Sequence, residues 1–271
     1  MDDIDRFLEE DLGDEGDITS ESLFTDEDAK AQIIAKEDCI IAGLEEIRNV
    51  FEKTGAKTEF KVKNGDSVKN RTIVALVNGT ARSILKGERL AINIIGRMSG
   101  IATETRRLVD ICRSINPNVS VAATRKTTPG FRKYEKKAVI IGGGESHRFG
   151  LYDAVMIKDN HIKLIGSVEK AISKVQDKVK NKIIEVEVEN EEDAIIAAKL
   201  SVDVIMLDNL DLESGEKIAK KIRQLNQNIL IEISGGITLS NISKYASFAD
   251  RISLGYITHS VKSIDFSLEI F

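Results

Sequence analysis

The stretch IIEVEVENEEDAIIAAKLSVDVIMLD (183–208) decides the fold, because it contains two short apolar runs separated by a helical segment. The first run, Ile183–Val188, carries Glu185 and Glu187, and the second, Val202–Leu207, ends at Asp208. Apolar strands that alternate with helices are typical of a parallel sheet covered by those helices. The stretch therefore predicts one strand–helix–strand unit.

The same pattern recurs on both sides of this stretch. Each apolar run ends at a polar residue or a glycine, and these end points are spaced by 21 to 33 residues: Arg125, Lys158, Glu187, Asp208, Ser234 and Gly255. Such intervals fit one strand, one helix and two loops. Six units predict an α/β fold, an open TIM-like α/β barrel, with a doubly wound open sheet as the alternative.

Residues 30–80 have a different pattern, which is typical of β structure. Phe60 and Val62 alternate with lysines before Asn64-Gly65, and the apolar run from Ile73 to Val77 ends at Asn78-Gly79. Asn-Gly favours the positive φ angles of a hairpin turn. These features predict a small antiparallel or mixed β module with turns at both Asn-Gly pairs.

Residues 83–115 have apolar residues at helical spacing, and Pro117 ends the pattern. Gly96 and Gly100 lie inside this segment. Because glycine weakens a helix, they predict a kink or two consecutive helices.

Composition excludes several classes of protein. The 39 Lys and Arg against 44 Asp and Glu give a net charge of −5, which argues against a nucleic-acid-binding protein. Apolar runs such as Cys39–Leu44 are too short to cross a membrane, and the acidic start does not resemble a secretory signal. Cys39 and Cys112 stand alone, which predicts reduced thiols and a cytoplasmic protein.

The loops after the strands of a parallel barrel converge on one mouth, where Arg125, Lys126, Lys158, Glu187 and Asp208 are expected to meet. The alternative is that salt bridges among these residues merely cap the barrel. The opposed acids suit Mg²⁺, sugar hydroxyls or a developing cation. His147, His161 and His259 lack the spacing of a zinc site.

Two glycine turns follow the last two predicted strands. Ser234-Gly235-Gly236 is expected to run into a helix amino terminus through Thr238 and Ser240. Glycine there lets a phosphate approach the backbone N–H groups, and Gly255 after the next strand would complete the phosphate site.

The most specific segment reads TRKTTPGFR (124–132), KAVIIGGGESHRFGL (137–151) and IKDNH (157–161). It resembles the quinolinate phosphoribosyltransferase family, the carboxylating nicotinate-nucleotide pyrophosphorylases. The resemblance covers the whole chain through EDLGDEGDIT (10–19), ER (88–89), SGIAT (99–103), EVEV (185–188), MLDN (206–209), SGGI (234–237) and THS (258–260).

The resemblance implies a fold and an activity. It implies an amino-terminal α/β sandwich domain, residues 1–105 joined by 260–271, and a barrel catalytic domain, residues 106–259. The family transfers phosphoribose from phosphoribosyl pyrophosphate to the ring nitrogen of quinolinate and releases CO₂. The products are nicotinate mononucleotide and pyrophosphate, on the route to NAD.

The resemblance also implies roles for individual residues. Arg125, His147 and Arg148 would face the quinolinate carboxylates, with Lys126 and Lys158 at the boundary with pyrophosphate. Glu187 and Asp208 would lie near the ribose and Mg²⁺. The other substrate-binding residues implied are Thr124 and the 5′-phosphate set Ser234, Gly235, Gly236, Leu254, Gly255, Tyr256 and His259. Arg89 would enter a neighbour's active site, which implies a homodimer as the minimal unit.

Three positions depart from the family pattern: Ala123 stands where Asp is common, Lys137 where Tyr is common and Ser146 where Asn is common. They leave open a paralogue associated with molybdenum transport, although Ile157–His161 favours the quinolinate enzyme. Two further alternatives are an aldolase-type barrel that forms a Schiff base at Lys158 and a phosphate-binding barrel without catalysis.

Overall fold

The computed structural model describes residues 2–271, which form two compact units. The first contains the chain up to Arg106 with Pro129–Gly143 and Ser260–Phe271, and the second contains Arg107–Thr128 and Gly144–His259. The predicted barrel domain included residues 129–143, whereas these residues pack with the first unit. Their helix α5 (Arg132–Ile141) carries the buried Glu135, which forms an ion pair of 2.8 Å with Arg97 of that unit.

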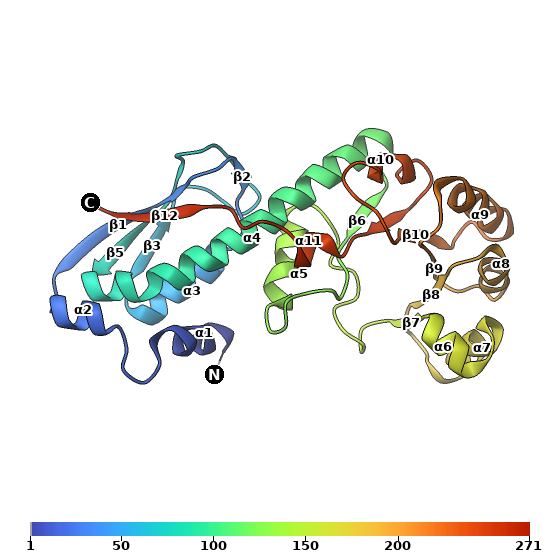
Figure 1. Cartoon of the computed structure of the whole chain (residues 1–271), viewed down its shortest axis with the longest axis horizontal. Coiled ribbons are helices and arrows are strands. Elements are labelled where there is room, and N and C mark those ends of the chain that lie inside the picture. Colours follow the sequence, from blue (N-terminus) through green and yellow to red (C-terminus); the bar gives the residue numbers. More distant parts are fainter. Residues whose placement is uncertain (1) are drawn as a thin grey trace. The chain divides into compact units, whose positions relative to one another are not determined.

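An antiparallel sheet and several helices make the first unit an α/β sandwich. The sheet order is β12 (Phe266–Ile270), β1 (Asp28–Ala35), β5 (Ile73–Thr80) and β3 (Lys57–Phe60). In Figure 1 the red strand β12 lies alongside the blue strand β1. The remaining elements are α1 (Asp3–Leu12), α2 (Ile18–Leu23), α3 (Leu44–Thr54) and the pair β2 (Cys39–Ile40) and β4 (Ser67–Val68).

Only one of the two Asn-Gly pairs forms a turn. Asn64 lies in a loop, where its side-chain oxygen accepts hydrogen bonds from the N–H groups of Gly43 and Leu44 at the start of α3. The prediction of a turn at Asn78-Gly79 was wrong, because β5 continues through both residues to Thr80. A Cβ at Gly79 would lie 3.0 Å from the Ala56 Cβ, so close packing explains the glycine.

The long helix α4 (Ala81–Ile115) runs without a break, contrary to the predicted alternative of two consecutive helices. Its glycines are needed for packing. A Cβ at Gly96 would lie 2.8 Å from the carbonyl oxygen of Ile264, and one at Gly100 would lie 2.3 Å from that of Lys262. The segment before β12 therefore crosses the helix at these two positions.

The second unit is an open TIM-like α/β barrel of six parallel strands. Their order is β6 (Ser120–Ala122), β11 (Arg251–Ser253), β10 (Leu230–Ser234), β9 (Val204–Asp208), β8 (Ile184–Val188) and β7 (Val155–Ile157). The first strand thus pairs with the last, unlike the order of a doubly wound sheet. The barrel is open between β6 and β7, where Glu145 makes a single bridge to Ala122.

The helices of this unit follow the strands in alternation. They are α6 (Asp159–Ile165), α7 (Val168–Lys178), α8 (Glu191–Lys199), α9 (Leu212–Leu225), α10 (Ile242–Tyr245) and α11 (Tyr256–His259). Contacts run from α7 to α8 and from α8 to α9. In Figure 1 the helices α7, α8 and α9 lie along the outside of β8, β9 and β10.

Within residues 2–271, no helix is both long and apolar enough to span a membrane. Cys39 and Cys112 are free thiols in the interior. Burial raises the pKa of each thiol to about 11, which keeps both thiols protonated near neutral pH.

Candidate active site

Polar side chains line the inner face of the barrel. The strand register pairs Glu187 with Met206, Met206 with Glu232, and Glu232 with Arg251. Residues paired across neighbouring strands point to the same face of a sheet. Polar residues therefore occupy positions that branched aliphatic residues fill in many TIM barrels.

Two adjoining pockets of the barrel unit contain the predicted site. One, of about 400 Å³, is lined by Thr124, Arg125, Lys126, His147, Arg148, Met156, Lys158, Glu187, Met206, Asp208, Glu232, Ser234 and Ser253. The other, of about 280 Å³, shares five of these residues and adds Asn209, Gly235, Gly236, Ile237, Leu254, Gly255, Tyr256 and His259. All the predicted site residues of the barrel therefore meet here, whereas Arg89 is exposed on α4 in the first unit.

The larger pocket combines positive and negative groups. Lys158, directly after β7, forms an ion pair with Glu187 of β8. Arg148 is buried, and its Nη1 donates to the carbonyl oxygen of Ala154 at 3.4 Å. Burial and the charge of Arg125 lower the pKa of Arg148. The two guanidinium groups repel each other, and a bound anion would stabilise both.

The glycine turns shape the smaller pocket. Gly235 and Gly236 have φ angles of 84° and 63°, and a Cβ at Gly235 would lie 2.2 Å from the Asn209 Oδ1. A Cβ at Gly255 would lie 2.8 Å from the Lys126 Cδ. The Thr258 hydroxyl donates to the Lys126 carbonyl oxygen at 2.7 Å, which joins the loop after β6 to α11. Small residues at both turns keep this pocket open to an anion.

The predicted helix amino terminus directly after Gly236 is not present. The next helix, α10, begins at Ile242 and has only four residues. The intervening loop is held by its own polar groups, since the Thr238 N–H donates to Asn241 Oδ1 at 2.8 Å and the hydroxyls of Thr238 and Ser240 lie 2.8 Å apart. An anion at Gly235 and Gly236 would therefore bind to the turn itself rather than to the amino terminus of α10.

His147 turns its imidazole towards two buried glutamates. Its Nε2 lies 3.0 Å from Glu185 Oε2 and 3.4 Å from Glu232 Oε2. Although burial opposes protonation, these two hydrogen bonds raise the pKa of His147 to about 9. The imidazole is therefore a cation near neutral pH.

Several functional candidates escaped the sequence reasoning. Glu232 and Ser253 line the larger pocket, and Glu185 lies beside them. The available signal was a charged residue inside an apolar strand, because a buried charge needs a partner. Of the three departures, Ala123 and Ser146 flank the site without lining it, and Lys137 forms ion pairs with Glu45 and Glu46 in the first unit.

Among the described residues, one cluster of ligand-type atoms has the compactness of a metal site. It comprises His147, Glu185 and Glu232, whose ligand atoms lie within 4.8 Å of one another. The predicted Mg²⁺ pair is a different set, Glu187 and Asp208, which line the larger pocket.

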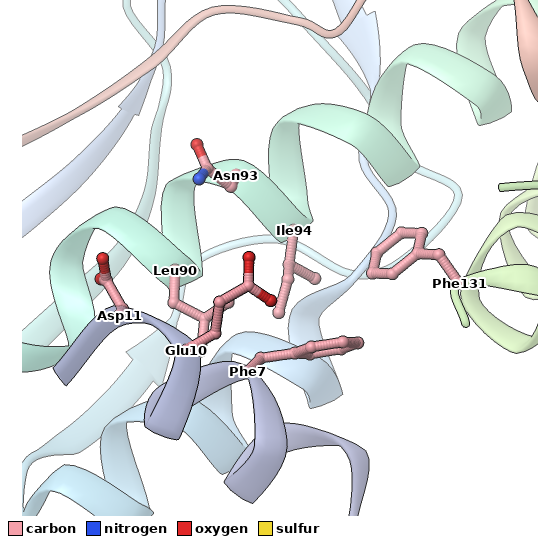
Figure 2. A pocket seen from close by; sticks show the side chains of 7 residues that line it. All are labelled: Phe7, Glu10, Asp11, Leu90, Asn93, Ile94 and Phe131. Carbon is pink, nitrogen blue, oxygen red and sulfur yellow. The ribbon is translucent and has the colours of Figure 1, made fainter. Parts of the chain in front are cut away.

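The first unit has a cavity of its own, of about 290 Å³ (Figure 2). Phe7 and Glu10 reach it from α1, Leu90 and Ile94 from α4, and Phe131 from the loop before α5. Its charged lining residues are acidic, Glu10 and Asp11, so its charge is opposite to that expected of a site for anionic substrates.

Comparison with known proteins identifies the family. The model of the quinolinate phosphoribosyl transferase C-terminal domain matches residues 101–269, and that of the N-terminal domain matches residues 17–99. A probable nicotinate-nucleotide pyrophosphorylase (carboxylating) from Archaeoglobus fulgidus is 44% identical over 94% of this chain and 98% of its own length. The nicotinate-nucleotide pyrophosphorylase (carboxylating) of Rattus norvegicus is 36% identical over 90% and 82%.

A solved structure agrees with these relatives. NadC from Streptococcus pyogenes is 38% identical, with a TM-score of 0.93, over 99% of this chain and 95% of that chain. Both family models and the full-length relatives point the same way, and the chain belongs to the quinolinate phosphoribosyl transferase family.

Proposed function

We propose that the protein transfers phosphoribose from phosphoribosyl pyrophosphate to the ring nitrogen of quinolinate. One carboxylate is then lost as CO₂, and the products are nicotinate mononucleotide and pyrophosphate, a step towards NAD. The observation that carries this proposal is the meeting of Arg125, Lys126, Arg148 and Lys158 with two acids and the glycine turns in two adjoining pockets of a family member.

The cations answer the main difficulty of this reaction, which is that both substrates are strongly negative. Arg125 and Arg148 are suited to the carboxylates of quinolinate, because a guanidinium donates two parallel hydrogen bonds to one carboxylate and fixes its plane. Lys126 lines both pockets and thus suits the boundary between the two substrates. Holding the ring nitrogen beside the anomeric carbon removes much of the entropic barrier.

The acids suit the charge that develops on the sugar. As pyrophosphate leaves, positive charge grows on the ribose, and Glu187 or Asp208 would stabilise it. The ammonium group of Lys158 pairs with Glu187, and it would form an ion pair with the departing pyrophosphate instead. The bond between the ring and one carboxylate then breaks, and the electron pair stays on the ring carbon beside the alkylated nitrogen, whose positive charge stabilises it. A proton from water takes the place of the lost CO₂, so we expect no covalent enzyme intermediate.

The residues also fit a role for Mg²⁺. Glu187 and Asp208 are hard oxygen donors, and Mg²⁺ is commonly held by one or two carboxylates with water and substrate phosphates. Bound Mg²⁺ would neutralise charge on the pyrophosphate. The cluster around His147 fits less well, because one of its three donors is an imidazole nitrogen.

We further propose that the protein works as a cytoplasmic homodimer in which Arg89 reaches the partner's pocket. Two observations support this role: Arg89 is exposed, and it lies on α4 outside the barrel unit. The Schiff-base alternative is disfavoured, since Lys158 is paired with a carboxylate rather than held in an apolar niche.

The proposed function is tested by supplying quinolinate, phosphoribosyl pyrophosphate and Mg²⁺ and measuring CO₂ and nucleotide together. We expect equal amounts of both products, and no nucleotide when nicotinate replaces quinolinate. CO₂ without nucleotide, or neither product from folded protein, would reject the proposal. Borohydride trapping of substrate on Lys158 would favour the aldolase-type alternative.

A further inference from the structure

The charged cluster at the larger pocket, whose lining includes His147 and Glu232, is almost completely buried. The side chains of His147, Glu185 and Glu232 are 6%, 3% and 0% exposed. They come from three places in the chain, since Glu185 lies on β8, Glu232 lies on β10 and His147 lies in the loop after α5. Burying charges is expensive, so the arrangement must be held by specific partners.

Glu232 is the better anchored of the two acids. It accepts hydrogen bonds from Arg251 Nη1 at 3.1 Å and from the Ser253 hydroxyl, both on the neighbouring strand β11. Arg251 also donates through Nε to Glu145 at 2.9 Å. Although burial opposes ionisation, contact with the protonated His147 lowers the pKa of Glu232. Glu232 is therefore a fixed anion.

Glu185 has fewer partners. Its Oε2 faces His147, and its Oε1 is a buried oxygen that has no hydrogen-bond partner among the described residues. Leaving a carboxylate oxygen without a partner costs free energy, so a stability argument alone does not explain this residue.

The backbone at His147 points to what the cluster does. His147 has a φ angle of 53°, a left-handed conformation that is unfavourable for a non-glycine residue. The chain turns there, so that the imidazole meets the two glutamates while the next residue, Arg148, lines the pocket. The contacts of Glu185 and Glu232 with the His147 imidazole stabilise this turn, and the turn sets the position of the Arg148 guanidinium.

We infer that Glu185 and Glu232 are positioning residues, which clamp His147 and thereby fix Arg148 for the carboxylate of quinolinate. This inference rests on the proposed function and deepens it. Neither glutamate touches substrate in this scheme, because each acts through the imidazole. The clamp explains why a buried acid with an unpaired oxygen is retained beside a cation-rich pocket.

A divalent metal ion held by the same three residues is the competing explanation. Arg251 argues against it, since its guanidinium lies 3.1 Å from the Glu232 oxygen that a metal would share. The guanidinium of Arg251 therefore already supplies the positive charge that a metal ion would bring to Glu232.

The test compares Glu185→Gln and Glu232→Gln with Asp250→Asn as a matched control. Asp250 pairs with Arg223 at 2.8 Å and precedes β11, at the amino end of the same sheet. Loosening Arg148 should raise the KM for quinolinate about tenfold or more in both glutamate variants and leave the KM for phosphoribosyl pyrophosphate within about twofold. Asp250→Asn should lower stability without changing either KM.

A double variant separates positioning from a general structural effect. If Glu185 acts through His147, then Glu185→Gln combined with His147→Gln should be no worse for quinolinate than His147→Gln alone. An unchanged KM for quinolinate in Glu185→Gln, or fully additive effects, would overturn the inference. So would stoichiometric Zn²⁺ or Mn²⁺ bound by the wild type and lost in Glu185→Gln. If the wild type makes no nucleotide, the proposed function itself fails.

Discussion

Lys158 and Glu187 are the pair of side chains on which the proposed chemistry depends most directly. Their ion pair connects the residue directly after β7 with a residue of β8, so the neighbouring strands fix the position of both side chains. Replacing Glu187 by Gln keeps the shape and removes the negative charge. We expect kcat to fall about 100-fold, because stabilisation of charge on the ribose is lost, with little change in the KM for quinolinate.

Steady-state kinetics with both substrates varied will check this expectation. Glu189→Gln is the matched control, since Glu189 directly follows the same strand but is exposed. A control that loses as much kcat as Glu187→Gln would show that the effect belongs to the strand end in general rather than to the carboxylate in the pocket.

His147 should make stability depend on pH. Its pKa is about 9 in the folded protein against an ordinary histidine value of 6.5, so the folded state binds its proton more tightly. This contribution is fully present below about pH 6.5 and is lost as the pH rises through about 9. The wild type should therefore exceed His147→Gln in stability by more at about pH 6 than at about pH 10.

Urea unfolding at the two pH values measures this difference, and comparing variants at each pH removes the effects of all other groups. A gap between wild type and His147→Gln that is the same at both values, or larger at high pH, would contradict a protonated imidazole between Glu185 and Glu232.

At the scale of single elements, α4 offers a test of why its glycines are there. Gly100→Ala would place a Cβ 2.3 Å from the carbonyl oxygen of Lys262, and we expect it to destabilise the protein by about 1–3 kcal/mol. Gly215 of α9 is the control, since a Cβ there would lie 3.6 Å from the Phe248 ring, an ordinary contact. Gly215→Ala should stabilise by about 0.5–1 kcal/mol.

Thermal unfolding of the two variants gives the signs directly. Opposite shifts support the packing explanation for Gly100. If Gly100→Ala also stabilises, then helix propensity dominates and the close approach of the segment before β12 does not constrain this helix.

The elements show how far sequence patterns reach. All six barrel strands were predicted, because each is a short apolar run with a clear polar end. The inner face was not predicted, since Glu185 and Glu232 become meaningful only when the register brings them to His147. The packing role of Gly96 and Gly100 was missed for a similar reason, because their contacts lie more than 150 residues further along the chain, at Ile264 and Lys262.

The departures from prediction at the level of domains have the same origin. Residues 129–143 follow the first barrel strand in sequence, yet α5 packs with the first unit through Glu135 and Arg97. A residue-by-residue pattern contains no information on such long-range partners. The strand ends predicted Arg125, Lys158 and Glu187, among others, and the family resemblance added residues such as His147 and Arg148. Their mutual distances came from the fold.

At the scale of the whole molecule, the proposed homodimer makes a prediction by complementation. Arg89→Ala and Lys158→Ala should each be nearly inactive. The first change removes a side chain from the pocket of the partner subunit, and the second removes one from the pocket of the same subunit. In a dimer of one Arg89→Ala subunit and one Lys158→Ala subunit, one pocket therefore lacks both side chains and the other pocket is intact. Co-expression of the two variants should therefore restore about a quarter of the wild-type activity.

The same assay on the two variants purified apart and mixed without subunit exchange provides the baseline. Activity of the co-expressed pair that does not exceed this baseline would show that Arg89 does not act across a subunit boundary.

The pairing of β12 with β1 has a consequence for how the polypeptide is made. The register joins Ala31 to Ile270, so the sheet of the first unit cannot close until residue 270 has left the ribosome. The barrel strands, which lie between residues 120 and 253, emerge earlier and can pair during translation. Until then β1 is an edge strand without a partner on one side, and such edges favour aggregation. We therefore expect a chaperone to bind this part of the nascent chain.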